Sequence, residues 1–267
     1  IQKEIVEEYN TIINRIKLNN QLIQKCEETA QAIYKQWFVD FEFPDEGGKF
    51  YKSNRGDMEF NEVLDQDIPK GWSLLKISDW GAVITGKTPT SEDPELFGDK
   101  IAFVTPTDYK HFSKFVLDTK RNLSDKGKDN LNKKILEPHS ILFTCIGSDM
   151  GKAVINMETC ITNQQINSIS PFELFYTDYL YYYLISVSSN LKSMAMSSST
   201  MPMLNKTDYE IIKILKPKDE LLKKFNLIME PLNQMIWSKV KLNKHLQILR
   251  EILLSKMSQI EPIEVAQ

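Results

Sequence analysis

Two short stretches of this sequence combine side chains that suit contact with a nucleic acid. Gly86-Lys87-Thr88-Pro89-Thr90 places a cation and two hydroxyls in a turn, where glycine permits close approach to a phosphate backbone. Asn163-Gln164-Gln165 offers carboxamides, which can bond bidentately to adenine. Ordinary alternatives exist for both stretches, namely a Gly/Pro turn with a solvent-facing lysine and amides that satisfy buried strand ends.

Three further stretches carry polar side chains beside turns. Residues 105–110 follow an expected strand and can reach a groove, although Asp108 can equally cap a turn. Gly147-Ser148 and Gly151-Lys152 suit a nest-like loop that holds a phosphate, but they lack the spacing of a nucleotide-binding loop. Residues 197–200 are hydroxyl-bearing and suit either a flexible loop or a phosphate contact.

The charge distribution gives mixed support to a nucleic-acid partner. The net charge of −3 argues mildly against it. Residues 110–134, however, hold eight basic and three acidic side chains, so this strip suits either phosphate contact or an ordinary solvated loop. The predicted DNA-contacting residues are Lys87, Thr88, Thr90, Thr107, Tyr109, Lys110, Lys114, Ser148, Lys152, Asn163, Gln164, Gln165, Ser199 and Thr200.

Other chemistries find little support in the residue patterns. The three cysteines and three histidines are scattered, which predicts reduced thiols and no metal site. A methyltransferase needs a glycine-rich cofactor loop and a catalytic Pro-Pro motif, and neither occurs. Asp108 with Asp118 and Lys120 loosely resembles a metal-dependent nuclease pattern, which leaves a nuclease as a weak alternative. We therefore expect no catalytic residues and no cofactor.

The chain is expected to lie in the cytoplasm. No apolar run approaches the ~20 residues that a membrane span requires. The sequence opens directly on a charged helical pattern and not on the pattern of a signal peptide.

The elements that must position these residues begin with one long helix, expected over residues 1–43. Apolar residues recur there at alternating spacings of four and three, which is the heptad pattern of a coiled coil, and Pro44 ends it. Asn19 occupies a heptad core position, where a polar residue can fix the register. A polar linker is expected over residues 44–67.

Residues 68–217 are expected to form a mixed α/β domain. Short β-prone runs alternate there with Gly and Pro turn signals. A helix is expected over residues 178–185 with Thr177 as its N-cap. Its aromatic residues are predicted to pack in a core and not to stack on bases. These are Tyr179, Tyr181, Tyr182 and Tyr183.

A second long helix is expected over residues 218–261, with Pro231 kinking it or separating a short helix from a long one. Lys17-Leu-Asn-Asn-Gln-Leu22 corresponds to Lys241-Leu-Asn-Lys-His-Leu246 at an offset of 224 residues, which indicates two equivalent helices that pair or share partners, although chance similarity remains an alternative. The overall prediction is an α+β chain, a mixed α/β domain flanked by two long coiled-coil helices. The residues predicted to pair the helices or dock partners are Ile12, Ile16, Ile23, Ile33, Leu242, Leu246, Leu249 and Leu253.

Several stretches, in this order, resemble the type I restriction–modification specificity subunit family, HsdS. Residues 30–44 look like the end of its central conserved helix, and Ile68-Pro-Lys-Gly-Trp72 with Gly86-Lys-Thr-Pro89 looks like the start of a recognition domain. Phe103-Val-Thr-Pro-Thr-Asp108 resembles a strand end of that domain. Later landmarks are matched by Ile146-Gly-Ser-Asp-Met-Gly-Lys152, Thr162-Asn-Gln-Gln165 and Thr200-Met-Pro-Met-Leu-Asn205.

The resemblance implies a non-catalytic DNA-recognition role. It implies two recognition domains in an intact subunit, each reading half of a split target, held apart by antiparallel helices. It further implies modification subunits docked on those helices and motor-nuclease subunits that join the complex. This chain resembles one half, with the C-terminal half favoured, and two copies could pair through their helices. The alternative is an adaptor whose helices bind protein only.

Overall fold

A computed structural model describes residues 2–90, 92–198 and 203–258 of the chain. The chain divides into two compact units. One unit, here called the helix pair, joins Ile1–Thr29 with Pro231–Gln267, and the other, here called the recognition unit, is Ala30–Glu230. The long helices α1 (Gln2–Tyr34) and α5 (Asp219–Ser258) each contribute to both units.

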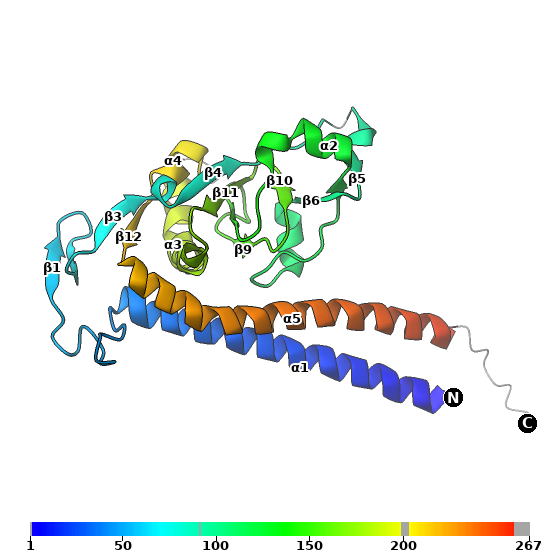
Figure 1. Ribbon diagram of the computed structural model, residues 1–267. Coiled ribbons are helices and arrows are strands. Elements are labelled where there is room, and N and C mark those ends of the chain that lie inside the picture. The colour runs from blue at the N-terminus through cyan, green and yellow to red at the C-terminus, as the bar shows by residue number, and fades with distance from the viewer. Residues whose placement is uncertain (1, 91, 199–202, 259–267) are drawn as a thin grey trace, which may run out of the picture. The chain divides into compact units, whose positions relative to one another are not determined.

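The helix pair is antiparallel, because the N-terminal end of α1 and the C-terminal end of α5 lie side by side (Figure 1). Its heptad core contains Ile23, Cys26 and Ile236, which are buried. Asn19 and Asn243 are also buried there, and the side-chain amide of Asn19 donates to Oδ1 of Asn243 at 2.8 Å. The two residues are separated by 224 positions, which is the offset of the sequence repeat. Equivalent residues of the repeat therefore face one another, as an approximate two-fold axis between antiparallel helices requires.

Both long helices differ in detail from the sequence prediction. The α-helix of α1 ends at Tyr34 and continues as a π-helical turn, Lys35–Val39, before Pro44 is reached. That turn buries Trp37 and Phe38. Helix α5 is one continuous element through Pro231, so of the two alternatives for this proline the separate short helix is wrong. Pro231 is exposed, so the carbonyl left without its usual amide donor can bond water.

Within the described residues, the recognition unit contains two four-stranded sheets, a local pair and a pair of strands far apart in the chain, with strand orders β10-β6-β7-β5, β4-β11-β8-β9, β1-β2 and β12-β3. All pairings are antiparallel except β10 with β6. Strand β1 and the first two residues of β2 lie within the segment 44–67, which was expected to be a linker. The strands are β1 (Met58–Asn61), β2 (Gln66–Pro69), β3 (Ser73–Lys76), β4 (Gly81–Thr85), β5 (Phe97–Gly98), β6 (Ile101–Val104), β7 (Asn122–Leu123), β8 (Ile141–Thr144), β9 (Ala153–Ile155), β10 (Cys160–Thr162), β11 (Ile166–Pro171) and β12 (Lys213–Lys216).

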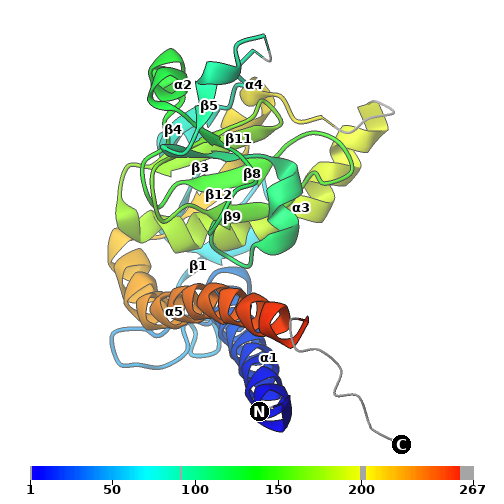
Figure 2. The ribbon, with the colours of Figure 1, turned by 90° about the vertical axis from the view of Figure 1, so that its right-hand side faces the viewer.

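Three shorter helices complete the recognition unit: α2 (Asp125–Asn130), α3 (Thr177–Ser198) and α4 (Lys206–Glu210). Helix α3 contacts β8 and β9, and its C-terminal end extends beyond the strands (Figure 2). The helix begins with Thr177, which has helical dihedrals and whose hydroxyl donates to the carbonyl of His139 at 3.4 Å, so the prediction of Thr177 as the N-cap is wrong. The helix also runs thirteen residues past the predicted end at residue 185. Tyr179 and Tyr182 are buried against the aromatic rings of Phe38 and Tyr34, so their predicted core role is confirmed.

Candidate nucleic-acid interface

Five polar segments of the recognition unit gather at one end of its two larger sheets. In the register of these sheets, the C-terminal ends of β4, β6, β8 and β10 lie beside the N-terminal ends of β9 and β11. The segments that leave or enter at these ends therefore converge, although they are far apart in sequence. We call them the polar edge, which consists of residues 86–90, 105–110, 145–152, 163–165 and 203–205.

Hydrogen bonds between main-chain groups join the segments of the polar edge. The amide of Lys87 donates to the carbonyl of Thr162 at 2.9 Å, and that of Asn163 donates to Val104 at 3.1 Å. The amide of Cys145 donates to Gln165 at 2.8 Å, and that of Leu204 donates in turn to Cys145 at 2.9 Å. These bonds tie four strand ends together, so the polar side chains are carried by a braced scaffold.

Gly86 is required by this close packing. A Cβ at position 86 would lie 2.2 Å from the carbonyl oxygen of Asn163 and 2.3 Å from that of Thr162. Any side chain would therefore push the segment 86–90 away from the segment 163–165. In the sequence, Gly86 suggested close approach to a phosphate backbone, whereas in the structure it permits close approach to the neighbouring protein backbone.

Residues 163–165, the amide-rich segment of the polar edge, hold their own side chains in place. The side-chain amide of Asn163 donates to Oε1 of Gln165 at 2.9 Å, and its Oδ1 accepts from the main-chain amide of Gln165 at 3.1 Å. Asn163 is only 8% exposed, so it braces the segment and does not face solvent. Gln164 is exposed, and its Oε1 accepts from the hydroxyl of Thr88 at 2.5 Å.

A second part of the polar edge collects positive charge around the loop from β8 to β9. Gly147 and Gly151 both have positive φ, which gives this loop its tight turns. Lys152 bonds Asp149 at 2.6 Å. That bond lowers the pKa of the Asp149 carboxyl, and the charges of Lys152, Lys110 and Lys192 lower it further. Lys152 bonds this carboxylate and the charges of Lys110 and Lys192 also act on it, so the lysines near this loop outnumber the acid that they act on.

Lys192 is a residue of this cluster that sequence reasoning missed. Its Nζ donates to the carbonyl of Ser148 at 2.7 Å, so the extended end of α3 lies beside the loop. The sequence predicts the end of this helix at residue 185, and α3 extends to Ser198, so Lys192 lies beyond the predicted element.

The threonine segment after β6 is a capped turn. Asp108 is 2% exposed, and its Oδ2 accepts from the main-chain amide and hydroxyl of Thr105 at 2.8 and 2.7 Å. Its Oδ1 accepts from the amide of Lys120 at 3.1 Å. Asp108 is therefore the structural cap that the sequence left as an alternative. Thr107 and Lys110, by contrast, are exposed beside it.

Two residues predicted to contact DNA lie in the core instead. Lys114 is 0% exposed, and its Nζ bonds the Asp178 carboxylate and the Tyr182 hydroxyl. Tyr109 is 6% exposed, and its hydroxyl donates to the carbonyl of Leu142 at 3.0 Å. Both predictions are wrong, as is that for Asn163, because these polar groups are buried and bonded within the protein.

The remaining predicted contacts differ in their exposure. Lys87, Thr90, Ser148 and Lys152 are exposed, while Thr88 and Gln165 are partly buried. Ser199 and Thr200 lie outside the described residues.

The basic strip of residues 110–134 does not form one surface. Lys126 bonds Asp93 and Glu95 at 2.8 and 2.7 Å, which raises its pKa to about 12. The guanidinium of Arg121 lies 5.3 and 5.4 Å from the ring centres of Phe97 and Phe103. Of this strip, Lys110 is the member that belongs to the polar edge.

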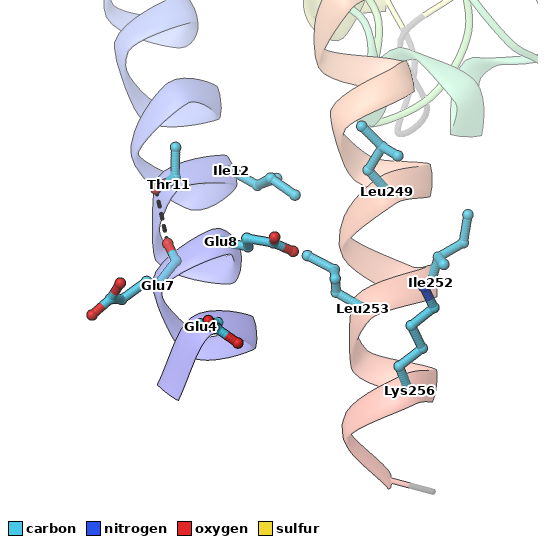
Figure 3. A pocket seen from close by; sticks show the side chains of 9 residues that line it. All are labelled: Glu4, Glu7, Glu8, Thr11, Ile12, Leu249, Ile252, Leu253 and Lys256. Atoms are coloured by element: carbon cyan, nitrogen blue, oxygen red, sulfur yellow. Dashed lines mark hydrogen bonds between the residues drawn. The ribbon is translucent and has the colours of Figure 1, made fainter. Parts of the chain in front are cut away.

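The predicted pairing residues line the helix pair with unequal burial. Ile23 is buried, Ile12, Ile16, Leu242, Leu246 and Leu253 are partly buried, and Leu249 is 49% exposed. Near the chain ends the helices leave a groove, where Glu8 and Ile12 point from α1 toward Leu249 and Leu253 of α5 (Figure 3). Ile33 belongs to the recognition unit and is partly buried there.

The described residues contain neither a metal-binding cluster nor a membrane-spanning helix. Among the residues that the structure describes, no group of three His, Cys, Asp or Glu side chains is placed to hold a metal ion. Within the same residues, no helix is both long and apolar enough to cross a membrane.

Residues 69–248 match the family described as "Type I restriction modification DNA specificity domain", and the chain belongs to this family. The match spans most of the recognition unit and continues into α5. It confirms the resemblance found in the sequence.

Two curated relatives agree with this assignment. The chain is 27% identical to the type I restriction enzyme HindI specificity subunit of Haemophilus influenzae, over 96% of this chain and 66% of the relative. It is 28% identical to the MjaIX specificity subunit of Methanocaldococcus jannaschii, over 79% of this chain and 49% of the relative. The chain thus spans between about half and two thirds of the length of these relatives.

A solved structure supports the fold. The type I S subunit from M. genitalium superposes with a TM-score of 0.64 at 16% identity, covering 95% of this chain and 59% of that chain. The predicted α+β fold with two long flanking helices is confirmed. The findings favour sequence-specific DNA recognition over the nuclease and protein-only adaptor alternatives.

Proposed function

We propose that this chain reads one half of a bipartite DNA target for a type I restriction–modification complex and has no catalysis of its own. The observation that supports this proposal most strongly is the polar edge, whose segments are joined by main-chain hydrogen bonds. It exposes Gln164, Lys87 and Thr107, and the lysines near Asp149 add positive charge. Amides and hydroxyls suit base edges, and lysines suit phosphates. The family assignment supplies the context in which such an edge faces DNA.

Methylated DNA would report this function directly. Methylation of genomic DNA is compared in cells with and without the chain, with the modification subunit present in both. Loss of one split methylated sequence on deletion supports the proposal, whereas unchanged methylation would contradict it.

The proposed partners are modification subunits, docked on the helix pair, and motor-nuclease subunits that join the assembly. Large apolar side chains on the helix pair support docking, because Leu18, Ile248 and Ile252 are 58, 47 and 48% exposed. Charged substitutions such as Leu18→Glu and Ile252→Glu are expected to abolish co-purification with the modification subunit. Glu28→Gln, an exposed change on the same helix pair, serves as the control.

A second recognition domain must read the other half of a bipartite target. We propose that it comes either from another part of a longer subunit or from a second copy of this chain. Mass measurement of the purified assembly distinguishes the two sources, since a second copy adds another 31.0 kDa. An assembly with one copy and no further recognition domain would contradict bipartite reading. Because it acts on DNA beside these partners, the chain is proposed to work in the cytoplasm.

A further inference from the structure

Each of the two glutamines of the polar edge has its side-chain oxygen bonded once within the protein. Oε1 of Gln164 accepts from the Thr88 hydroxyl at 2.5 Å, and Oε1 of Gln165 accepts from the Asn163 side chain at 2.9 Å. In the part of the chain that the structure describes, neither side-chain Nε2 forms a hydrogen bond. Both side chains therefore present amide hydrogens in preference to carbonyl oxygens.

Gln164 is the more accessible of the two glutamines, because its side chain is exposed. Its bonding partner, Thr88, is held in place by the neighbouring main chain. Thr88 lies one residue past Lys87, whose main-chain amide bonds Thr162, and Gly86 lets this segment lie against residues 162–163. The Thr88 hydroxyl is thus held where it can fix the orientation of the Gln164 carboxamide. Thr88 becomes a positioning residue, and the Nε2 group of Gln164 becomes the group directed to a base.

The polarity of this group limits what it can read. Bidentate reading of adenine needs an acceptor for the N6 amino group and a donor for N7. The Thr88 hydroxyl engages one of the two lone pairs of the Gln164 oxygen and fixes its direction, so the Nε2 group is the unbonded donor of this carboxamide. In the major groove, guanine offers N7 and O6, adenine offers N7 and thymine offers O4, whereas cytosine offers only an amino donor.

We propose that Gln164, oriented by Thr88, reads a base acceptor in the major groove and discriminates against cytosine at one position of the target. This inference rests on the proposed function and specifies the chemistry of the same site. It replaces the bidentate adenine contact that the sequence suggested.

Variants of both residues test the proposal in the complex with the modification subunit, using a library of DNA sites randomised at each target position. Gln164→Glu keeps the acceptor for Thr88 but replaces the donor with an oxygen. The ratio of the affinity for the original base to that for cytosine is expected to fall about tenfold or more at one position. The reason is that the variant presents an acceptor where the wild-type side chain presents a donor to the base. Using a ratio cancels the general effect of the added negative charge.

The positioning role is tested by removing only the hydroxyl. Thr88→Val is expected to relax discrimination at the same position, while Thr88→Ser, which retains a donor, preserves it. Thr159→Val is the matched control, because Thr159 is exposed at the opposite end of β10.

Base analogues then identify the acceptor at the position found with Gln164→Glu. If it holds a purine, replacing N7 with carbon is expected to weaken binding about tenfold, whereas removing an adenine N6 amino group leaves binding unchanged. If it holds thymine, an analogue lacking O4 has the same effect as loss of N7. Dependence on the N6 amino group would instead restore bidentate adenine reading and overturn the proposal.

The outcomes separate this inference from the proposed function. A wild-type complex without base preference would overturn both. A wild-type complex with a defined target, whose discrimination is unchanged in Gln164→Glu and Thr88→Val, would overturn this inference alone.

Discussion

The helix pair and the recognition unit both place carboxamides at critical points, but they use them in opposite ways. Asn19 and Asn243 are 4 and 8% exposed and bond one another, and the side-chain amide of Asn243 also donates to Asn20 at 2.7 Å. Gln164 is exposed and has only its oxygen bonded. Amides that satisfy one another fix a register, whereas an amide that is half satisfied remains available to a ligand.

The same contrast holds for lysines of the recognition unit. Lys114 is fully buried beside Asp178 and near the rings of Tyr181 and Tyr182, at 5.0 and 4.6 Å from their centres. Lys110 is exposed four residues earlier in the chain. Residue type therefore does not separate a structural lysine from a candidate phosphate contact, and only the tertiary environment does.

The largest expected effect is on the buried lysine. Lys114→Met removes the cation and leaves the Asp178 carboxylate buried without it, so the free energy of unfolding should fall by about 3–5 kcal/mol. Denaturant unfolding of the chain measures this change. Lys110→Met is the matched control and should leave stability nearly unchanged. Equal stability of the two variants would show that Lys114 has been assigned the wrong role.

A smaller effect is expected in the helix pair. Asn19→Leu removes the donor to the buried Oδ1 of Asn243, while Nδ2 of Asn243 keeps its bond to Asn20, and this loss should cost about 1–3 kcal/mol. The double variant Asn19→Leu with Asn243→Leu should recover much of this stability while losing the fixed register. Thermal unfolding measures the first effect, and disulfide trapping between cysteines introduced on α1 and α5 measures the second. A double variant that traps in a single register would contradict the registering role of the amides.

The smallest expected effect is at the lysine cluster of the polar edge. Lys152→Gln or Lys192→Gln should each remove about one phosphate contact, which lowers the slope of log affinity against log salt by about 0.9. Binding by the complex with the modification subunit, measured over a salt series, gives this slope. The preferred DNA sequence should stay the same, since phosphate contacts carry no direct sequence information. A changed sequence preference would contradict the phosphate contact and indicate that these lysines contact bases.

The helix pair was predictable because its determinants are local. Heptad spacing reports which residues of one helix face a partner. The repeat of Leu18 and Asn19 at Leu242 and Asn243 indicated two helices that pair or share partners, and the bond between Asn19 and Asn243 shows that they pair. The Asn19 prediction followed from its heptad position alone. The π-helical turn at Lys35–Val39 was not predictable, because it depends on aromatic packing of Trp37 and Phe38 within the recognition unit.

The polar edge was predictable in its segments but not in its geometry. Turn signals located the loops around Gly86, Gly147 and Gly151, and their residue types suggested contacts with DNA. The bond between Thr88 and Gln164 spans 76 residues, and that between Lys114 and Asp178 spans 64. No local pattern encodes such pairings, so the sequence could not tell which polar group is a support and which is free.

The contact between Asn19 and Asn243 has a consequence for how genes of this kind can be rearranged. Each asparagine meets its own counterpart from the repeat, so the two helices are interchangeable at the crossing point. A tandem duplication of the segment between them would create a new helix already matched to the old one. The intervening globular unit can then be exchanged or added as a cassette, because the join that receives it carries the same amide on either side.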